Sequence, residues 1–324
     1  MSRIFSGIQP SGEITIGNYL GAIRNWVKLL KDHESIFCIV DQHAITVEYE
    51  ADRLQRRIFE AAAANIAAGL DPRKCVLFVQ SLVPEHTELT WYFNTVTSMG
   101  DLGRMTQFKE KSRRHPENIN VGLFDYPVLQ SADILLYKAD KVPVGEDQVQ
   151  HIELSREVAR KFNARFGEVF PEPQALLSPT PRIMGLDGKT KMSKSMNNYI
   201  GLVEEPESIR KKLATALTDE NRKRRNDPGN PDICNIFTLH KSFSPAEDVE
   251  MIDVECRRAG IGCVDCKKKL GDRMLAELEP IRERYHHLLD HPDEVRAPLA
   301  EGAERCRGIA AETMDGVRRA MGLR

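Results

Sequence analysis

The sequence has neither a long apolar run nor a strong excess of charge of one sign. No stretch approaches the ~18 consecutive apolar residues that a membrane span needs. The first residues, MSRIFSGIQPSGE, lack the apolar core of a secretion signal. Because 46 Lys and Arg stand against 48 Asp and Glu, an anionic partner must be bound by local basic patches. These absences predict a cytoplasmic protein that does not contact membranes.

Two common catalytic patterns are also missing. The Gly/Pro/Ser-containing segment 7–23 does not end in the Gly-Lys-Ser/Thr of a P-loop, and no Ser-His-Asp or Cys-His arrangement is apparent. The seven cysteines do not indicate a disulfide framework, because the cytoplasm keeps thiols reduced. Clustered cysteines in such a chain favour a metal site or catalysis.

A chain of 324 residues fits two domains. The pattern of apolar residues changes near residue 190, which is where we expect the boundary. Strands are predicted at 3–8, 35–41, 75–80 and 141–145, and helices over 20–30, 51–70, 126–138 and 146–166. Strands separated by helices predict βαβ units. We therefore expect an α/β class, with a doubly wound, Rossmann-like parallel sheet in residues 1–190 and an all-helical domain in 191–324. The ligand crevice of such a sheet lies at the carboxyl ends of its strands.

The first chemical motif is GIQPSGEITIGNYLGAI at 7–23, a strand that leads through a loop into a helix beginning near Gly17. Backbone N–H groups at a helix start bind anions, and glycine lets a ligand approach the backbone closely. An ordinary strand, turn and helix cap explains the segment at least as well, since Ser, Thr and Gly are common at caps.

The second motif is KTKMSKS at 189–195, where the two predicted domains meet. Its lysines, Lys189, Lys191 and Lys194, lie among small polar residues, without the paired carboxylates that usually neutralise a solvated charged face. In isolation, a flexible basic linker is a fair interpretation of this segment.

Together, the two motifs resemble the paired signatures of class I aminoacyl-tRNA synthetases, known as HIGH and KMSKS. TIGN at 15–18 occupies the place of HIGH, and KMSKS at 191–195 is complete. The segments FCIVDQHAIT, RMTQFKEKS, YPVLQSADILLY and VPVGEDQVQHIELSR look like the tryptophanyl-tRNA synthetase family in particular. The match covers most of residues 5–200 and becomes weaker in the helical part. The resemblance implies a ligase that activates L-tryptophan with ATP to Trp-AMP and pyrophosphate, then transfers tryptophan to tRNA(Trp).

In this reaction the amino-acid carboxylate attacks the α-phosphate of ATP, so no protein nucleophile is needed. Catalysis rests on positioning and on charge stabilisation by lysines, backbone amides and Mg²⁺. The resemblance assigns the catalytic charges to Lys191, Lys194 and Lys111. It places these residues at the ATP site: Gln9, Pro10, Ser11, Gly17, Asn18, Gly145, Glu146 and Asp147 (the last three on the ribose side), Ile183 at the adenine, and Lys191, Met192, Ser193, Lys194 and Ser195.

For the amino acid, Asp133 is the sharpest candidate. The indole N–H only donates hydrogen bonds, so a tryptophan pocket needs a fixed acceptor. A buried acceptor without its partner costs ~1–3 kcal/mol. Asp133 precedes the apolar residues 134–136 and so lies beside an apolar face, although a helix-surface aspartate is the ordinary alternative.

The resemblance adds residues around the rest of the amino acid. Tyr126 and Gln148 are expected to hold its ammonium group, and Phe5, His43, Val142 and Val144 to wall the ring. For His43 taken alone, a structural histidine is the simpler interpretation. Gln130 departs from the family pattern, because we take Met as typical there, and it puts the finer pocket geometry in question. The alternative functions are a tyrosine-specific synthetase and an accessory paralogue that mainly binds RNA or a partner.

Four cysteines, Cys234, Cys256, Cys263 and Cys266, form the pattern C-x21-C-x6-C-x2-C. Four thiolates suit either zinc or an iron–sulfur cluster, and the long first gap disfavours a compact zinc ribbon. Some bacterial members of the resembled family carry a 4Fe-4S cluster with closely similar spacing. We therefore favour 4Fe-4S over Zn²⁺ and over free thiols. The remaining cysteines, Cys38, Cys75 and Cys306, are expected to be buried and inert.

Basic runs at 210–212, 222–225 and 267–269 suit phosphate contacts, although such runs are more often solvated charge. Two of them flank the cysteines. By the same resemblance, the helical domain binds tRNA(Trp) on the anticodon side and the protein is a homodimer.

Overall fold

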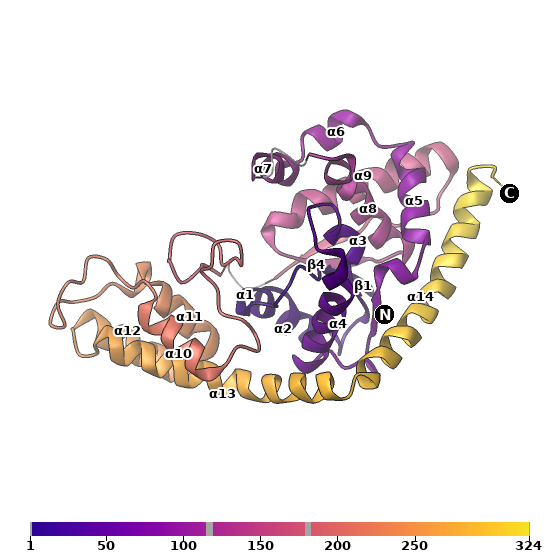
Figure 1. Ribbon diagram of the computed structural model, residues 1–324. Helices are drawn as coiled ribbons and strands as arrows, with labels where there is room; N and C mark the ends of the chain where they lie inside the picture. Colours follow the sequence, from indigo (N-terminus) through magenta and orange to yellow (C-terminus); the bar gives the residue numbers. More distant parts are fainter. Residues whose placement is uncertain (1, 115–118, 179–182, 324) are drawn as a thin grey trace.

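A five-stranded parallel sheet forms the centre of the computed structural model, which describes residues 2–114, 119–178 and 183–323 (Figure 1). The strands are β1 (Arg3–Ile8), β2 (Glu34–Ile39), β3 (Val76–Val79), β4 (Lys141–Val144) and β5 (Gln174–Leu177). Their order is β3-β2-β1-β4-β5, with every pairing parallel. The expected doubly wound α/β class is confirmed. The order reverses between β1 and β4, and ligands bind at such a switch point.

The four predicted strands are all present, with ends shifted by at most two residues. β2 and β3 are almost wholly buried, as expected for strands covered by helices on both faces. The prediction misses β5, because its residues QALL are mostly exposed and contain no β-branched side chain.

Helices cover both faces of this sheet. They are α1 (Ile16–Asn18), the π-helical η1 (Tyr19–Ile23), α2 (Arg24–Leu29), α3 (Asp41–Ala44), α4 (Ala51–Ala67), η2 (Gln80–Leu82), α5 (Glu85–Asn94), α6 (Met99–Gly103), α7 (Thr106–Arg114), α8 (Val121–Leu136), η3 (Glu146–Gln148) and α9 (Val149–Phe166). Alternate residues of β2 face opposite sides. Phe37 and Ile39 join the core with α2 and α4, while Ile36 and Cys38 join the core with α5, α8 and α9.

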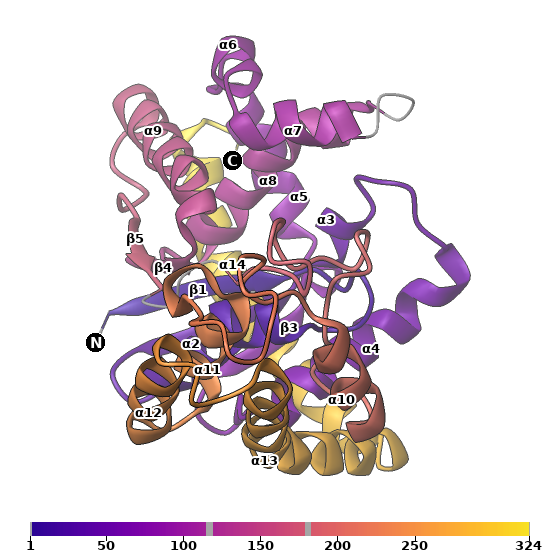
Figure 2. The same ribbon diagram turned by 90° about the vertical axis from the view of Figure 1, so that its left-hand side faces the viewer.

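The second half of the chain is helical. Its helices are α10 (Pro206–Thr215), η4 (Pro231–Ile233), α11 (Asn235–Phe243), α12 (Ala246–Arg257), α13 (Cys263–Asp290) and α14 (Asp293–Ala320). The group of α10, α11, α12 and the start of α13 stands to one side of the sheet in Figure 1, and in Figure 2 it faces the viewer in front of the sheet. α13 then runs from this group to α4.

The last helix returns to the sheet. α14 packs on β3, α5 and α8, and a Cβ at Gly302 would lie 2.1 Å from the carbonyl oxygen of Leu77 in β3. Cys306 of the same helix is fully buried. The division at 190/191 stays a prediction, and α14 is the part of the predicted helical domain that packs on the sheet. Among the described residues, the search for helices long and apolar enough to span a bilayer finds none.

Candidate active site and cysteine cluster

The first motif forms the expected loop and helix cap. The Thr15 Oγ1 accepts a hydrogen bond from the Asn18 backbone N–H at 3.2 Å, and the Asn18 Oδ1 accepts one from the Thr15 backbone N–H at 3.1 Å. The π-helical η1 follows directly, and such deviations are frequent at functional sites. Gly17 faces the second motif, since a Cβ there would lie 3.6 Å from the Met192 side chain.

The second motif folds back onto the first. The Lys194 Nζ donates hydrogen bonds to the Ser11 backbone oxygen at 2.8 Å and to the Ser11 Oγ at 3.3 Å. Burial lowers the pKa of Lys194 from its ordinary value. The Lys191 Nζ lies 3.1 Å from Oδ2 of Asp147, so a lysine predicted to be catalytic is paired with a carboxylate predicted on the ribose side.

Residues that the sequence analysis did not single out hold this motif in place. The Asn198 Oδ1 accepts a hydrogen bond from the Ser193 backbone N–H at 2.8 Å, and its amide nitrogen donates to Asp187 Oδ2 at 3.0 Å. The Thr190 hydroxyl donates to Asp187 at 2.6 Å, and this bond is the main reason that the pKa of Asp187 is lowered. A Cβ at Gly185 would lie 2.0 Å from the Asn198 amide. Lys191 and Lys194 thus extend from a turn that several hydrogen bonds hold together.

A cavity of about 500 Å³ opens beside β1 and β4, at the switch point of the sheet. Its lining includes every residue predicted to bind tryptophan, together with Gln130: Asp133, Tyr126, Gln148, Phe5, His43, Val142 and Val144. From the predicted ATP site, Gln9 and Gly145 line it. The other predicted ATP residues are not part of its lining: Pro10, Ser11, Gly17, Asn18, Glu146, Asp147, Ile183, Lys191, Met192, Ser193, Lys194 and Ser195. Ile183 is joined to this second group, because its oxygen accepts a hydrogen bond from the Met192 N–H at 3.1 Å.

Asp133 is buried at the wall of the cavity and accepts three hydrogen bonds. Its Oδ1 accepts from the Gln80 Nε2 at 2.6 Å and from the His86 Nδ1 at 2.6 Å, and its Oδ2 lies 2.7 Å from the His43 Nε2. Burial acts to raise the pKa of Asp133, but the His43 and His86 interactions outweigh burial and hold that pKa well below its usual range. A carboxylate has about four acceptor positions, so Oδ2 keeps one for a donor in the cavity.

The hydrogen bonds around Asp133 account for both interpretations of His43. They also involve residues that the sequence analysis did not name. His43 both lines the cavity and bonds to Asp133, so the structural and the substrate-binding interpretations are compatible. His86 continues the network, because its Nε2 lies 2.8 Å from the Tyr137 hydroxyl. Tyr126 is positioned similarly, since its hydroxyl lies 3.0 Å from the His151 Nε2. Lys111 belongs to α7, but its side chain lies outside the described part of the structure.

The four clustered thiols are gathered where η4, α12 and α13 meet. The Arg222 Nη1 lies 3.8 Å from the Cys256 Sγ and 3.9 Å from the Cys263 Sγ. Burial and the three other thiols raise the pKa of Cys266 to about 12. Within the described chain, no three of these sulfur atoms lie within 4.8 Å of one another, and all are free of disulfides. The remaining cysteines, Cys38, Cys75 and Cys306, are buried.

Most cations of the predicted basic runs have partners within the chain. Arg210 pairs with Asp272, Lys212 with Glu204 and Lys269 with Asp248. Four exposed cations form no side-chain hydrogen bond or ion pair within the described residues: Lys211, Lys223, Arg224 and Lys268. The paired cations fit the interpretation as solvated surface charge, and the phosphate contacts stay a prediction for the four unpaired ones.

Comparison with known proteins identifies the family. Residues 1–279 match the family of tRNA synthetases class I (W and Y). The tryptophan--tRNA ligase of Deinococcus radiodurans is 53% identical, with 100% of this chain and 99% of that protein covered. The one from Helicobacter pylori is 45% identical, with 99% and 98% covered. The structure of tryptophanyl-tRNA synthetase from Campylobacter jejuni, complexed with ADP and tryptophane, superposes with a TM-score of 0.89 at 35% identity over 99% of both chains.

These findings place the chain among the class I aminoacyl-tRNA synthetases. Within that class, the chain belongs to the family of tryptophan and tyrosine enzymes.

Proposed function

We propose that the cavity carries out the activation step of a tryptophan–tRNA ligase, the activity that full-length relatives at 44% to 53% identity support for this chain. The observation that carries the mechanism is Asp133. It is buried and ionised, its orientation is fixed by Gln80, His43 and His86, and it keeps acceptor capacity toward the cavity. An indole N–H is a donor that matches this acceptor, and the apolar walls Phe5 and Val142 suit the ring.

The positions of the two motifs support in-line attack on ATP beside this pocket. With the indole at Asp133 and the ammonium group at Tyr126 and Gln148, the substrate carboxylate would face Gln9 and the first motif. The carboxylate oxygen attacks the α-phosphorus, the bond from that phosphorus to the bridging oxygen breaks, and pyrophosphate leaves with the electron pair. Lys191, Lys194 and Mg²⁺ would stabilise the charge on pyrophosphate, with Lys111 as a further candidate.

The pairing of Lys191 with Asp147 bears on this step. The two side chains are about half exposed, so the ion pair is weak and a nucleotide can replace it. We propose that ATP takes over both groups, with the ribose on Asp147 and the phosphates on Lys191. The adenine would lie against Ile183, close to the backbone of Met192.

ATP–pyrophosphate exchange tests this assignment. Tryptophan is expected to be the best amino-acid substrate. Asp133→Asn should lower kcat/KM for tryptophan about 10- to 100-fold, because the amide replaces a charged acceptor by a weaker one. Asp125→Asn, on the same helix but outside the cavity lining, is the matched control and should leave the rate unchanged. Faster exchange with tyrosine would identify a tyrosine enzyme, and exchange with neither amino acid would identify an accessory paralogue.

For the transfer step, we propose that the helical group α10–α13 receives tRNA(Trp) through the unpaired cations. Lys223 and Arg224 lie in the loop before η4, and Lys211 and Lys268 lie on α10 and α13. Unpaired surface cations are the groups that release counterions when they meet phosphate. Replacing all four by Gln should weaken tRNA binding and flatten its salt dependence, without changing ATP–pyrophosphate exchange.

We further propose that Cys234, Cys256, Cys263 and Cys266 hold a 4Fe-4S cluster. Four free thiols in one place, with the Arg222 guanidinium between two of them, are a suitable donor set. A tetrahedral zinc site with Zn–S bonds of about 2.3 Å would bring its sulfur atoms to about 3.8 Å from one another. The C-x21-C-x6-C-x2-C spacing, whose long first gap disfavours a compact zinc ribbon, favours the iron–sulfur cluster over a single zinc ion. The cluster would fix the loop that carries Lys223 and Arg224, and no catalytic step requires it.

Anaerobic purification followed by iron, sulfide and zinc analysis tests this proposal. A brown protein with about four iron atoms per chain is expected. A colourless protein with one zinc per chain would indicate a zinc site instead, and a protein with no metal would indicate free thiols.

A homodimer and a cytoplasmic location complete the proposal. Trp91, Met99 and Val121 are 69%, 73% and 80% exposed, and contact with a second copy of the chain would remove such apolar side chains from water. Light scattering of the purified chain gives the oligomeric state. The cytoplasm supplies the tRNA and ATP that the reaction uses.

A further inference from the structure

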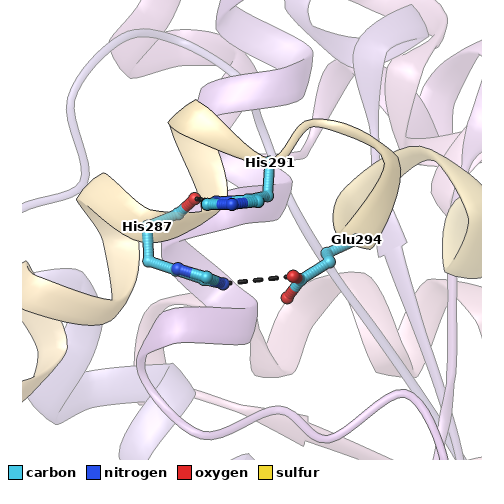
Figure 3. Close-up of side chains that lie close together, drawn as sticks. All are labelled: His287, His291 and Glu294. Carbon is cyan, nitrogen blue, oxygen red and sulfur yellow. Dashed lines mark hydrogen bonds and ion pairs between the residues drawn. The ribbon is translucent and has the colours of Figure 1, made fainter.

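A group of possible metal ligands lies on the surface at the joint between α13 and α14 (Figure 3), and it includes neither a cavity residue nor a cysteine. His287 is in the last turn of α13, His291 is its C-terminal cap, and Glu294 is in the first turn of α14. One ligand atom from each lies within 4.8 Å of the others, and all three residues are exposed. It is the one group of this kind among the described residues.

The hydrogen bonds and ring positions of the two histidines leave a ring nitrogen available to a cation. His291 Nδ1 lies 2.9 Å from the backbone oxygen of His287. A carbonyl only accepts, so Nδ1 carries the proton and Nε2 keeps the lone pair that binds metals. The His287 and His291 rings are stacked, with centroids 4.1 Å apart and planes at 22°, because residues at i and i+4 share one face of a helix.

The third ligand already contacts the first. The His287 Nε2 lies 3.1 Å from the Glu294 Oε1, and because a carboxylate accepts, the Nε2 carries the proton of this hydrogen bond. In a zinc site with bonds of about 2.0–2.2 Å, two ligand atoms are separated by about 3.4 Å. An ion can therefore replace this proton with little movement of His287 and Glu294, while the exposed His291 ring turns toward it.

We propose that His287, His291 and Glu294 bind one divalent transition-metal cation of the Zn²⁺ type. Two imidazoles and one carboxylate are a ligand set that suits Zn²⁺, whereas Mg²⁺ and Ca²⁺ prefer oxygen ligands. Three protein ligands leave one position for water. The end of α13 also favours a cation, because the unpaired carbonyls of a helix C-terminus carry partial negative charge.

The bound cation links two helices that serve different parts of the molecule. α13 begins with Cys263 and Cys266 and packs on α10 and α11 at that end, whereas α14 packs on β3 and α5. The cation joins the end of the first helix to the start of the second. It therefore fixes the angle between α13 and α14, and none of its three ligands is part of the cavity lining.

The experiment uses the full-length chain without a histidine tag, purified anaerobically so that the cysteine cluster keeps whatever it holds. Titrations with Zn²⁺ and with Co²⁺ are compared for the wild type, His287→Asn, His291→Asn and Glu294→Gln. His286→Asn is the matched control, because His286 is an exposed neighbour on α13 that does not belong to the group. Co²⁺ reports the ligand type, since thiolate ligands add a charge-transfer absorption that imidazole and carboxylate do not.

We expect the wild type and His286→Asn to bind one Zn²⁺ more than His287→Asn or His291→Asn. Glu294→Gln should bind this Zn²⁺ at least about tenfold more weakly than the wild type. The additional Co²⁺ should show no thiolate absorption. Zn²⁺ should slow amide hydrogen exchange over 285–296 in the wild type and not in His287→Asn.

Three results would overturn the inference. Equal Zn²⁺ binding in all variants, or equal loss in His286→Asn and His287→Asn, would show that these residues form no specific site. Binding that leaves hydrogen exchange at the joint unchanged would show that the cation does not link the helices.

Discussion

The ammonium group of Lys194 donates a hydrogen bond to the backbone oxygen of Ser11, a residue 183 positions earlier in the chain, at 2.8 Å. This contact joins the two motifs that the sequence shows far apart. A lysine held against the loop of the first motif is next to the place where an anion would bind at the start of α1. Its partner atom is a neutral carbonyl, so the charge of Lys194 remains available to phosphate.

Lys194→Ala should lower the rate of ATP–pyrophosphate exchange by about 10²–10³, the cost of removing one donor aimed at developing charge. Lys189→Ala is the control, since among the described residues the Lys189 side chain pairs with the exposed Glu220, and this variant should retain nearly full activity. Steady-state kinetics should place the loss mainly in kcat. An equal loss in both variants would mean that the loop responds to total charge rather than to the position of Lys194.

The lowered pKa of Asp133 predicts a pH dependence of stability. Its folded pKa lies below the ordinary value of about 3.9, so its ionised form stabilises the folded chain above that value. This contribution is lost as the pH falls through the lowered pKa. The difference in unfolding free energy between the wild type and Asp133→Asn should therefore be constant from about pH 7 to pH 5 and shrink below about pH 4. Urea denaturation at each pH measures it, and a difference that grows in acid would contradict the assignment.

The sequence analysis pointed to Asp133 but not to its partners, for a physical reason. The resemblance to tryptophan enzymes requires an acceptor for the indole N–H, and the apolar residues 134–136 follow Asp133. Gln80 and His86 precede it by 53 and 47 positions, and only the packing of η2 and α5 against α8 brings them to its carboxylate. A single sequence carries no signal for such a contact.

The predicted ends of some helices were inaccurate for similar reasons. The prediction of a helix over 126–138 misses the start of α8, where the Asn120 Oδ1 accepts a hydrogen bond from the Leu123 N–H at 2.9 Å. Pro127 lies inside this helix, and a proline there suggests a helix start rather than an interior. In contrast, the strongly apolar β2 and the alanine-rich α4 were predicted closely, because their patterns are long and unambiguous.

Gly302 gives a prediction about the packing of α14. A Cβ at this position would lie 2.1 Å from the carbonyl oxygen of Leu77, and the backbone of β3 cannot move aside cheaply, because β3 is hydrogen-bonded to β2. Gly302→Ala should therefore destabilise the chain by about 1–3 kcal/mol or more. Gly308→Ala, on the same helix with nothing near the added Cβ, should stabilise it by up to about 1 kcal/mol. Equal effects of the two substitutions in urea denaturation would show that α14 does not pack against β3 as described.

The cysteine cluster gives the last prediction, which separates the two steps of the reaction. Cys266 is in the first turn of α13, far from the cavity, while the neighbouring loop carries Lys223 and Arg224. Cys266→Ser should remove one ligand, loosen that loop and reduce tRNA charging more than Trp-adenylate formation. Cys75→Ser is the control, because Cys75 is a buried thiol beside β3 and outside the cluster. Aminoacylation and ATP–pyrophosphate exchange, measured on the same preparations, give the comparison. An equal loss of both activities in Cys266→Ser would show that the cluster supports the catalytic domain as well. ATP–pyrophosphate exchange does not involve tRNA, so a change limited to the tRNA-binding loop would leave that activity intact.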